Sequence, residues 1–360
     1  MKKLLTKTGF LLAILFVMVG LFVSACEGPA GPAGVDGKDG KDADASCGKC
    51  HNDAADDVNL KFAQYDLSKH NKGIVYEEEA GRIGCAGCHT GDGFAEAAKL
   101  GQDDAVSKAT SKINCAACHP IHTKYDSTDF SLRITAGFAL RHTKAAIDQK
   151  TGNICSKCHQ ARAYTRTVPD TVSPASSTAS YSRFGPHYGT PANVITENGL
   201  YKIAGSTAYP TSVNKHATLP KGCVSCHMGS DATNPAVGGH SFLMPVANLA
   251  NRTDCYDCHD KAKLTARANY KDMQAKLVTY RQKLIEKGFI DTTQAVTAEG
   301  YQILGEYFAT PGGKKRVFTN PTDVEVTLNY LYVAKDRSFG VHNPAFVKAI
   351  VENGLEYLSK

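Results

Sequence analysis

Twelve of the thirteen cysteines in this 360-residue chain fall into six Cys-x-x-Cys-His motifs, and this spacing is its strongest chemical signal. The motifs consist of Cys47, Cys50 and His51; Cys85, Cys88 and His89; Cys115, Cys118 and His119; Cys155, Cys158 and His159; Cys223, Cys226 and His227; and Cys255, Cys258 and His259. Two thiols separated by two residues can add to the two vinyl groups of one haem. The adjoining histidine then ligates the iron from one side.

Zinc sites and disulfides are the two alternatives for so many cysteines. Zinc held by two Cys-x-x-Cys pairs would use the thiols but would leave six adjacent histidines unexplained. A disulfide scaffold is typical of much shorter chains and ignores the same histidines. We therefore expect six covalently bound haem c groups. The motif starts are 38, 30, 40, 68 and 32 residues apart, which favours one domain wrapped around its haems over a tandem repeat.

The seven histidines outside the motifs are the candidates for the second axial position of each iron. They are His70, His122, His142, His187, His216, His240 and His342. Six irons need six such ligands, so the supply matches bis-histidine ligation with one histidine to spare. Methionine ligation is disfavoured, because Met228 adjoins His227 and cannot reach the opposite face of that iron. Bis-histidine ligation predicts lower reduction potentials than His/Met ligation.

The local sequence already restricts some of these candidates. His122 follows His119 by three residues, so both cannot bind opposite faces of one iron, and His122 would serve a neighbouring haem. His187 lies in the run Gly185-Pro186-His187-Tyr188-Gly189, a loop fixed by glycine and proline. His216 and His240 flank the fifth motif, and His70 lies between the first two motifs.

Several segments resemble exported multihaem cytochromes of metal- and mineral-respiring bacteria. They are the runs 115–122 with 129–133, 185–189, 216–228 and 239–242. The segment from Asp336 to Pro344 (DRSFGVHNP) is similar to the C-terminal ligand motif of the pentahaem nitrite reductase superfamily. The resemblance implies that the distal ligands are His70, His122, His187, His216, His240 and His342, with His142 as the spare. That superfamily holds its catalytic haem through lysine in a CxxCK motif, whereas all six motifs here end in histidine, which argues against its activity.

The N-terminus has the pattern of an export signal. Three lysines precede an apolar run over 9–23 that is too short for a membrane span, and Val23-Ser24-Ala25-Cys26 resembles a bacterial lipobox. We predict a lipoprotein signal peptide over 1–25 with lipid attachment at Cys26. The alternative is an ordinary signal peptide with an unrelated cysteine.

Glycine recurs at every third position from Gly28 to Gly40, as in collagen. Five triplets are few for a triple helix, so we expect residues 26–46 to form the lipid anchor and an extended tether. Local trimerisation is the alternative.

The remaining chain predicts a mainly α fold with extensive irregular loops. We expect a multihaem cytochrome c domain wrapped around six haems over 47–260, and a C-terminal helical segment over 261–360 that supplies His342. An amphipathic pattern predicts a helix over 261–287 ending before Gly288, and further helices are expected over 298–308 and from Pro344 to Leu358. Short strands are expected within 181–209.

Composition and charge exclude some functions. The formal charge is +6, but residues 1–25 carry three lysines and no acidic residue, and no basic stripe indicates nucleic acid binding.

We predict an electron carrier, not an enzyme, in the cell envelope as an outer-membrane lipoprotein, with its cell-surface exposure left open. Its expected partners are the membrane, other cytochromes or a porin-cytochrome complex, and extracellular or mineral electron acceptors. The alternatives are a reductase of a small nitrogen or sulfur oxyanion, which needs an open haem, and a subunit of a cytochrome filament.

Overall fold

The computed structural model describes residues 56–105, 108–163, 185–229, 231, 234, 237–244, 252, 255–291, 307–308 and 320–360. All of these residues belong to one compact unit, Asp53–Lys360. The predicted signal peptide, the tether, Cys26 and the first motif with Cys47, Cys50 and His51 lie outside the described residues.

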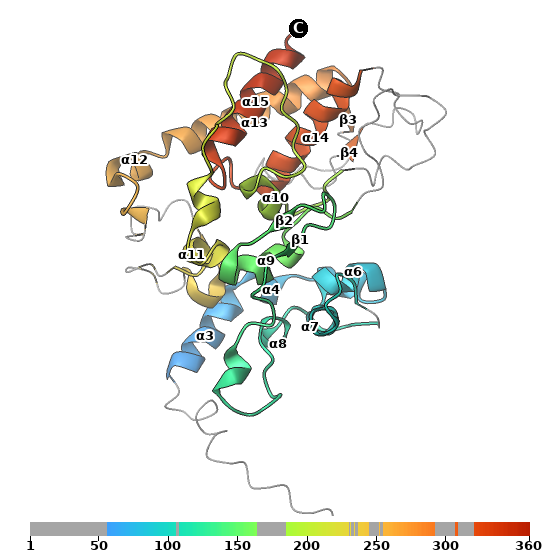
Figure 1. The fold of residues 1–360 in the computed structure, drawn as a ribbon, viewed down its shortest axis with the longest axis vertical. Coiled ribbons are helices and arrows are strands. Elements are labelled where there is room, and N and C mark those ends of the chain that lie inside the picture. The colour runs from blue at the N-terminus through green and yellow to red at the C-terminus, as the bar shows by residue number, and fades with distance from the viewer. Residues whose placement is uncertain are drawn as a thin grey trace, which may run out of the picture. The chain divides into compact units, whose positions relative to one another are not determined.

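Secondary structure in the described residues is mostly helical and is joined by irregular segments, which confirms the predicted fold class (Figure 1). The first elements are α3 (Asp56–Leu67), α4 (Lys69–Lys72), α5 (Val75–Glu79), α6 (Ile83–His89), α7 (Gly91–Leu100), α8 (Cys115–Cys118), η1 (Ser127–Phe130), η2 (Lys150–Gly152) and α9 (Asn153–Cys158). They are followed by α10 (Pro191–Ile195), η5 (Lys215–Thr218), α11 (Cys223–His227), η6 (Gly239–Ser241), α12 (Lys261–Ala266), α13 (Ala268–Glu286), α14 (Pro321–Asp336) and α15 (Pro344–Leu358).

Strand structure is limited to two short antiparallel ribbons in the described residues. Strand β1 (Phe138–Ala139) pairs with β2 (Ala146–Ile147), and β3 (Ile290–Asp291) pairs with β4 (Tyr307–Phe308). The strands expected within 181–209 do not form over 185–209, where the one regular element is α10. Proline at the first position of α10 supplies a backbone angle suited to a helix start.

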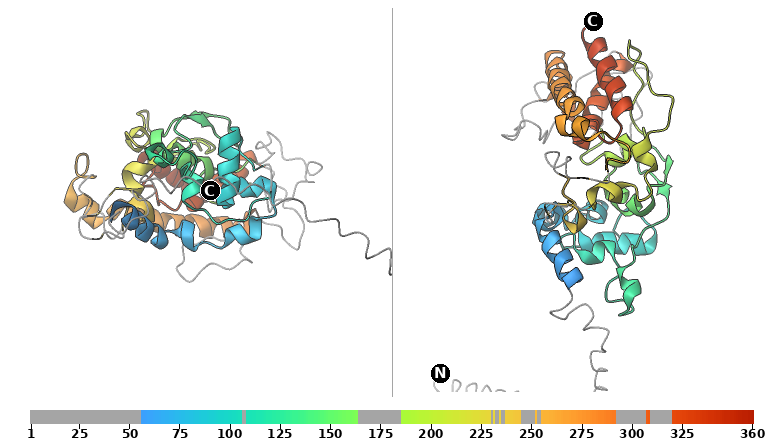
Figure 2. Two further views of the ribbon diagram at one scale, coloured as in Figure 1. Left: turned by 90° about the horizontal axis from the view of Figure 1, so that it is seen from below. Right: turned by 90° about the vertical axis from the view of Figure 1, so that its left-hand side faces the viewer.

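Helices α13, α14 and α15 carry the largest hydrophobic core and pack against one another (Figure 2). Met273, Leu277, Tyr280 and Leu284 form the buried stripe of α13 at helical spacing. The Tyr280 hydroxyl donates a hydrogen bond to the carbonyl of Val326 in α14 (3.0 Å). The three-helix cluster is therefore held by both apolar packing and a buried polar contact.

The C-terminal helices differ from the predicted ones at three places. The helix predicted over 261–287 is divided at Arg267, whose left-handed backbone (φ 53°) ends α12 and starts α13. The segment predicted as a helix over 298–308 ends in strand β4, and its other residues lie outside the described set. Helix α14 was not predicted. The helix from Pro344 to Leu358 is confirmed as α15.

The region around the motifs has little hydrophobic core of its own. Its described part contains three clusters of three buried residues each: Ala86, Ala105 and Ala109; Phe94, Ala117 and Ile154; and Leu140, Ile147 and Ala192. A folded domain ordinarily has one contiguous core. Such small clusters are consistent with the expectation that this domain is wrapped around haems.

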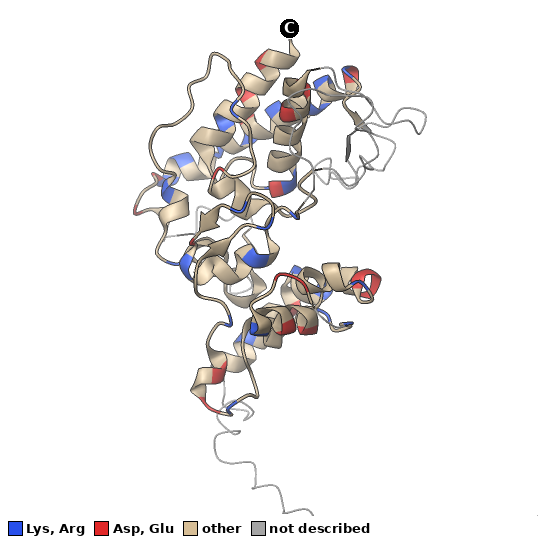
Figure 3. Ribbon diagram, turned by 45° about the vertical axis from the view of Figure 1, so that its right-hand side comes forward, with Lys and Arg blue, Asp and Glu red and all other residues tan. Residues whose placement is uncertain are grey.

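Charged residues of both signs are interspersed along the described elements (Figure 3). Lys276 bridges Asp272 and Glu352, and Lys157 pairs with Asp103 at 2.7 Å. None of the described helices is both long and apolar enough to cross a membrane.

Candidate haem sites

Each described motif folds into one turn of backbone that presents its cysteines together. In the third, fourth and sixth motifs the histidine N–H donates to the carbonyl of the first cysteine (2.9, 2.9 and 3.0 Å), and the second and fifth motifs lie within α6 and α11. Residues three apart in a helical turn lie on the same face. The two thiols of a motif therefore face one side, as attachment to a single macrocycle requires. The ten described cysteines form no disulfide with one another.

Five motif histidines each lie opposite a histidine from elsewhere in the chain. The ring centroids are 6.1 Å apart for His159 and His70, 6.1 Å for His89 and His187, 6.3 Å for His119 and His240, 6.2 Å for His227 and His342, and 5.9 Å for His259 and His216. Each pair joins one motif histidine to one candidate distal ligand, and no histidine is shared.

This spacing fits two axial ligands of one iron. A histidine nitrogen lies about 2 Å from a bound metal and the ring centre about 1 Å further, so two imidazoles on opposite sides have centroids about 6 Å apart. Within the described residues, no three His, Cys, Asp or Glu side chains converge where they would hold a metal ion. The histidines instead lie in pairs, each next to the two thiols of a motif. Two histidines and two thiols are the groups that hold bis-histidine haem c.

Hydrogen bonds at Nδ1 orient several of these rings. His119 Nδ1–H donates to the carbonyl of Phe130 (2.8 Å), His216 Nδ1–H to that of Val341 (2.6 Å), and His227 Nδ1–H to that of Phe242 (3.2 Å). A carbonyl oxygen only accepts, so Nδ1 carries the proton and Nε2 keeps its lone pair. The ring nitrogen available to iron is thereby Nε2 in all three.

Burial keeps two of these paired histidines, His159 and His187, in the neutral form that can bind metal. Burial, followed by the charges of neighbouring histidines, lowers the pKa of His159 to about 4. Burial and the nearby Arg162 lower the pKa of His187 to about 4. Imidazoles with these pKa values are neutral at pH 7 and need lose no proton to bind iron.

Helix α3 and the caps around it position two distal candidates. Gln64 in α3 accepts a hydrogen bond from the His240 backbone N–H (3.0 Å). A Cβ at Gly239 would lie 2.1 Å from that same Gln64 oxygen, and the left-handed backbone there (φ 49°) would strain any other residue, so glycine favours the approach. Ser68 caps α4 by accepting from Asn71 N–H (3.1 Å), which fixes the short helix that carries His70.

Two buried asparagines hold the irregular segment that leads to His216. The Asn329 amide of α14 exchanges hydrogen bonds with the backbone N–H and carbonyl of Tyr201, both at 2.8 Å. Asn353 of α15 does the same with Thr207, both at 2.9 Å. The C-terminal helices thus position residues 200–214 as well as supplying His342.

Motif turns also contact one another directly. The Cys158 sulfur of the fourth motif lies 3.9 Å from the carbonyl oxygen of Gly87 in the second motif, and the Ser156 hydroxyl of the fourth motif lies 3.8 Å from the Cys223 sulfur of the fifth. A Cβ at Gly152, just before α9, would lie 2.6 Å from the backbone nitrogen of Cys223. The fourth motif therefore lies between the second and the fifth.

Phe242 contacts histidines of three different pairs. Its ring lies 5.2 Å from that of His70 and 6.0 Å from that of His240, while its carbonyl accepts from His227. Its backbone is left-handed (φ 55°), a strained conformation for an aromatic residue that its packed surroundings must maintain. Sequence analysis did not identify Phe242, because nothing in its type marks this role.

His122 and His142 are the two candidates that do not belong to the five pairs. His122 lies in a loop organised by Asp129, whose carboxylate accepts from the backbone N–H groups of Thr123 (3.0 Å) and Lys124 (2.9 Å). Its partner by elimination would be His51, which lies outside the described residues. The assignment of His122 as ligand and of His142 as the spare stays a prediction.

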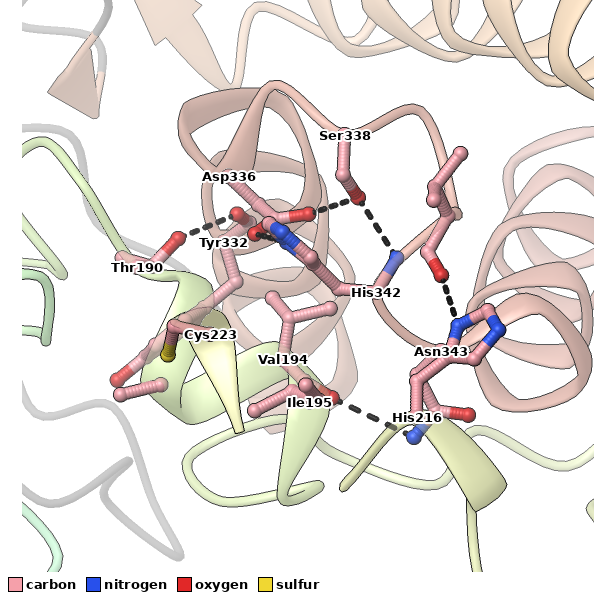
Figure 4. Close-up of polar contacts among 12 residues, drawn as sticks. Thr190, Val194, Ile195, His216, Cys223, Tyr332, Asp336, Ser338, His342 and Asn343 are labelled. Carbon is pink, nitrogen blue, oxygen red and sulfur yellow. Dashed lines mark hydrogen bonds and ion pairs between the residues drawn. The ribbon is translucent and has the colours of Figure 1, made fainter. Parts of the chain in front are cut away.

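Asp336 is a second residue that sequence analysis missed as part of a site. It begins the DRSFGVHNP segment, and Figure 4 shows its carboxylate directed at both His342 and Ser338. The His342 Nδ1–H donates to Asp336 Oδ1 at 2.6 Å. Burial lowers the pKa of His342, but the Asp336 carboxylate outweighs it and the net direction is upward. An acidic residue six positions before a candidate ligand was the available signal.

No protein-family model and no curated protein sequence matches the chain. Among solved structures it is similar to the crystal structure of the outer cell wall cytochrome OcwA, at 17% identity and a TM-score of 0.49, covering 83% of this chain and 50% of that one. It is also similar to the undecaheme cytochrome from the S-layer of Carboxydothermus ferrireducens, at 18% identity and a TM-score of 0.44, covering 81% of this chain and 40% of that one. The chain thus spans half or less of the length of these two cytochromes.

Proposed function

We propose that this chain is a six-haem c-type cytochrome that transfers electrons at the cell envelope. The observation that carries the proposal is the set of five histidine pairs, each placing one motif histidine about 6 Å from a histidine elsewhere in the chain. The chain has six motifs and seven further histidines, enough for the motif of His51 to have a partner histidine as well.

Haem c supplies a one-electron ferric/ferrous couple when it is bound. The chain's own contribution would be to hold both axial positions with imidazoles, so that gaining or losing an electron would change no ligand. The carbonyls of Phe130, Val341 and Phe242 keep three of these rings in one orientation. If these pairs hold both axial positions at five centres, small molecules would be excluded from those irons, and this supports electron transfer over reduction of an oxyanion.

Contacts between the sites support a continuous route. The second and fourth motifs meet where Cys158 approaches Gly87, and the fourth and fifth meet where Ser156 approaches Cys223. The fifth and sixth are joined because His216 bonds the carbonyl of Val341, the residue before His342. Electrons would pass along the order second, fourth, fifth, sixth, with the third centre joined through Phe242.

The proposal includes a location and partners. Cys26 would carry the lipid anchor, the tether over 26–46 would separate the haem domain from the outer membrane, and the electron donors and acceptors would be other cytochromes, a porin-cytochrome complex or extracellular minerals. Membrane and soluble fractions of cells expressing wild type or Cys26→Ala should differ in where haem is found. Equal membrane-bound haem in both would refute the anchor while leaving the electron-transfer proposal intact.

The main experiment is an optical and EPR comparison of the purified holoprotein, oxidised and then reduced under CO. We expect low-spin signals from every haem and no spectral change with CO. A high-spin haem that binds CO would contradict complete bis-histidine ligation and would support the reductase alternative. A pyridine haemochrome assay run alongside gives the haem count, for which we expect six per chain.

A further inference from the structure

The ligand His342 differs from the other oriented ligands in the charge of its hydrogen-bond partner. His119, His216 and His227 donate from Nδ1 to neutral backbone carbonyls. His342 donates instead to the side chain of Asp336 at 2.6 Å, and that side chain is fully buried. A hydrogen bond at Nδ1 thus orients each of these four rings, but only His342 has a carboxylate as its acceptor.

The carboxylate is held in a closed ring of hydrogen bonds at the end of α14 (Figure 4). The Ser338 hydroxyl donates to Asp336 Oδ2, and the His342 backbone N–H donates to Ser338 Oγ (3.2 Å). The chain turns here through left-handed residues at Arg337 and Phe339, which bring His342 back beside the helix end. The conformation of the backbone between Asp336 and His342 therefore positions these two side chains for their hydrogen bond.

We propose that Asp336 lowers the reduction potential of the centre held by His227 and His342. A carboxylate that accepts the Nδ1 proton makes the imidazole a stronger electron donor through Nε2, and its charge is little screened because it is buried. Both effects stabilise the ferric form over the ferrous form. The inference rests on the proposed function, because it requires haem at the fifth motif, and it adds a residue that sets the energy of one step in the route.

Ser338 gives the proposal a second consequence with the opposite sign. Its hydroxyl donates to the same carboxylate and so withdraws charge from the bond to His342. Removing that hydroxyl should leave the carboxylate a stronger acceptor and lower the potential further. A residue that merely held His342 in place would not produce opposite shifts on removal of Asp336 and Ser338.

The test is a spectroelectrochemical titration of holoprotein carrying Asp336→Asn, Ser338→Ala or, as the control, Asp323→Asn. Asp323 makes the same type of carboxylate contact with Tyr357 (2.9 Å) near the start of α14, about 20 Å along the helix from Asp336. We expect D336N to change the equilibrium constant of one centre about tenfold, a rise of about 59 mV for a one-electron couple. S338A should shift that centre downward by less, and D323N should not shift it.

Haem counts and low-spin EPR signals distinguish a failure of the proposed role of Asp336 from a failure of the proposed function of the whole chain. Titration curves of D336N and wild type that overlay, with equal haem counts and spin states, would overturn the role of Asp336 alone. A wild-type protein lacking haem at the fifth motif would instead overturn the proposed function. If D336N releases His342 and becomes partly high-spin, S338A decides the matter: a downward shift supports the proposal and an unchanged or raised potential overturns it.

Discussion

The contact between Gly152 and Cys223 leads to a prediction about how closely two haem motifs must pack. Gly152 ends η2 and directly precedes α9, and Cys223 begins α11. A Cβ at position 152 would lie 2.6 Å from the backbone nitrogen of Cys223 and 3.0 Å from its sulfur. Gly152→Ala must therefore move one motif relative to the other, because neither a backbone atom nor a haem-linked sulfur can rotate away.

The size of the effect follows from the geometry. An ordinary contact of this kind begins at 3.4 Å, so the two segments must separate by roughly 0.8 Å. Overpacking of this type costs about 1–3 kcal/mol, and the φ of −74° at Gly152 lets alanine recover about 0.4–1 kcal/mol through the unfolded chain. A net loss of about 1–2 kcal/mol corresponds to a melting temperature lower by about 2–8 °C.

The assay is thermal unfolding of the oxidised holoprotein, followed by circular dichroism at one scan rate. Gly81→Ala is the matched control, because a Cβ there meets nothing within 4 Å and the backbone is not left-handed. We expect G81A to melt with wild type and G152A to melt below both. If G152A and G81A melt together, the close packing of the fourth and fifth motifs does not set the stability of this region, and the steric argument is refuted.

Three further predictions concern ligands and pH. His240→Ala should convert one haem from low-spin to high-spin and make it reactive with CO; unchanged EPR and CO spectra would contradict its role. His122→Ala should do the same to the haem of the first motif while His142→Ala should not, and the reverse result would exchange their assignments. Partial burial raises the pKa of Glu352, but hydrogen bonds from two lysines outweigh it and lower the value from 4.5 to about 2. The Glu352 carboxylate therefore stabilises the fold above its pKa of 4.5 in the unfolded chain, and this stabilisation is lost as the pH falls toward 2. Glu352→Gln should lower stability at neutral pH in urea titrations, with a difference from wild type that closes over that interval; a constant difference would refute the assignment.

The Cys-x-x-Cys-His motifs could be recognised in the sequence, whereas the pairing of their histidines with histidines elsewhere in the chain could not. Cys-x-x-Cys-His is a local pattern, and a single helical turn brings its three side chains to one haem. The partner of His159 is His70, almost ninety positions earlier in the sequence, and no local pattern encodes such a contact. Histidine counting gave the candidates, and the three-dimensional packing gave five of the pairs.

The helices show the same division between local and tertiary information. Helix α15 was predictable because proline at its first position and a one-sided apolar pattern mark it. Helix α14 was missed because it is buried almost all round, so it lacks the amphipathic period that reveals a surface helix. The break at Arg267 was missed because the apolar spacing continues on both sides of it.

The interleaving of the ligand pairs constrains the order of events during biogenesis. If the proposed function holds, haem could be attached to each motif while the chain is still unfolded, because the two cysteines of a motif are close in sequence. The second ligand of each iron would bind later, because the segment from His70 to His159 overlaps the one from His89 to His187, and His342, the partner of His227, lies in the loop before the last helix. Contacts this distant in sequence form slowly. A maturing chain would therefore pass through haem-loaded forms in which irons lack their second ligand, and binding of those ligands would mark the completion of the fold.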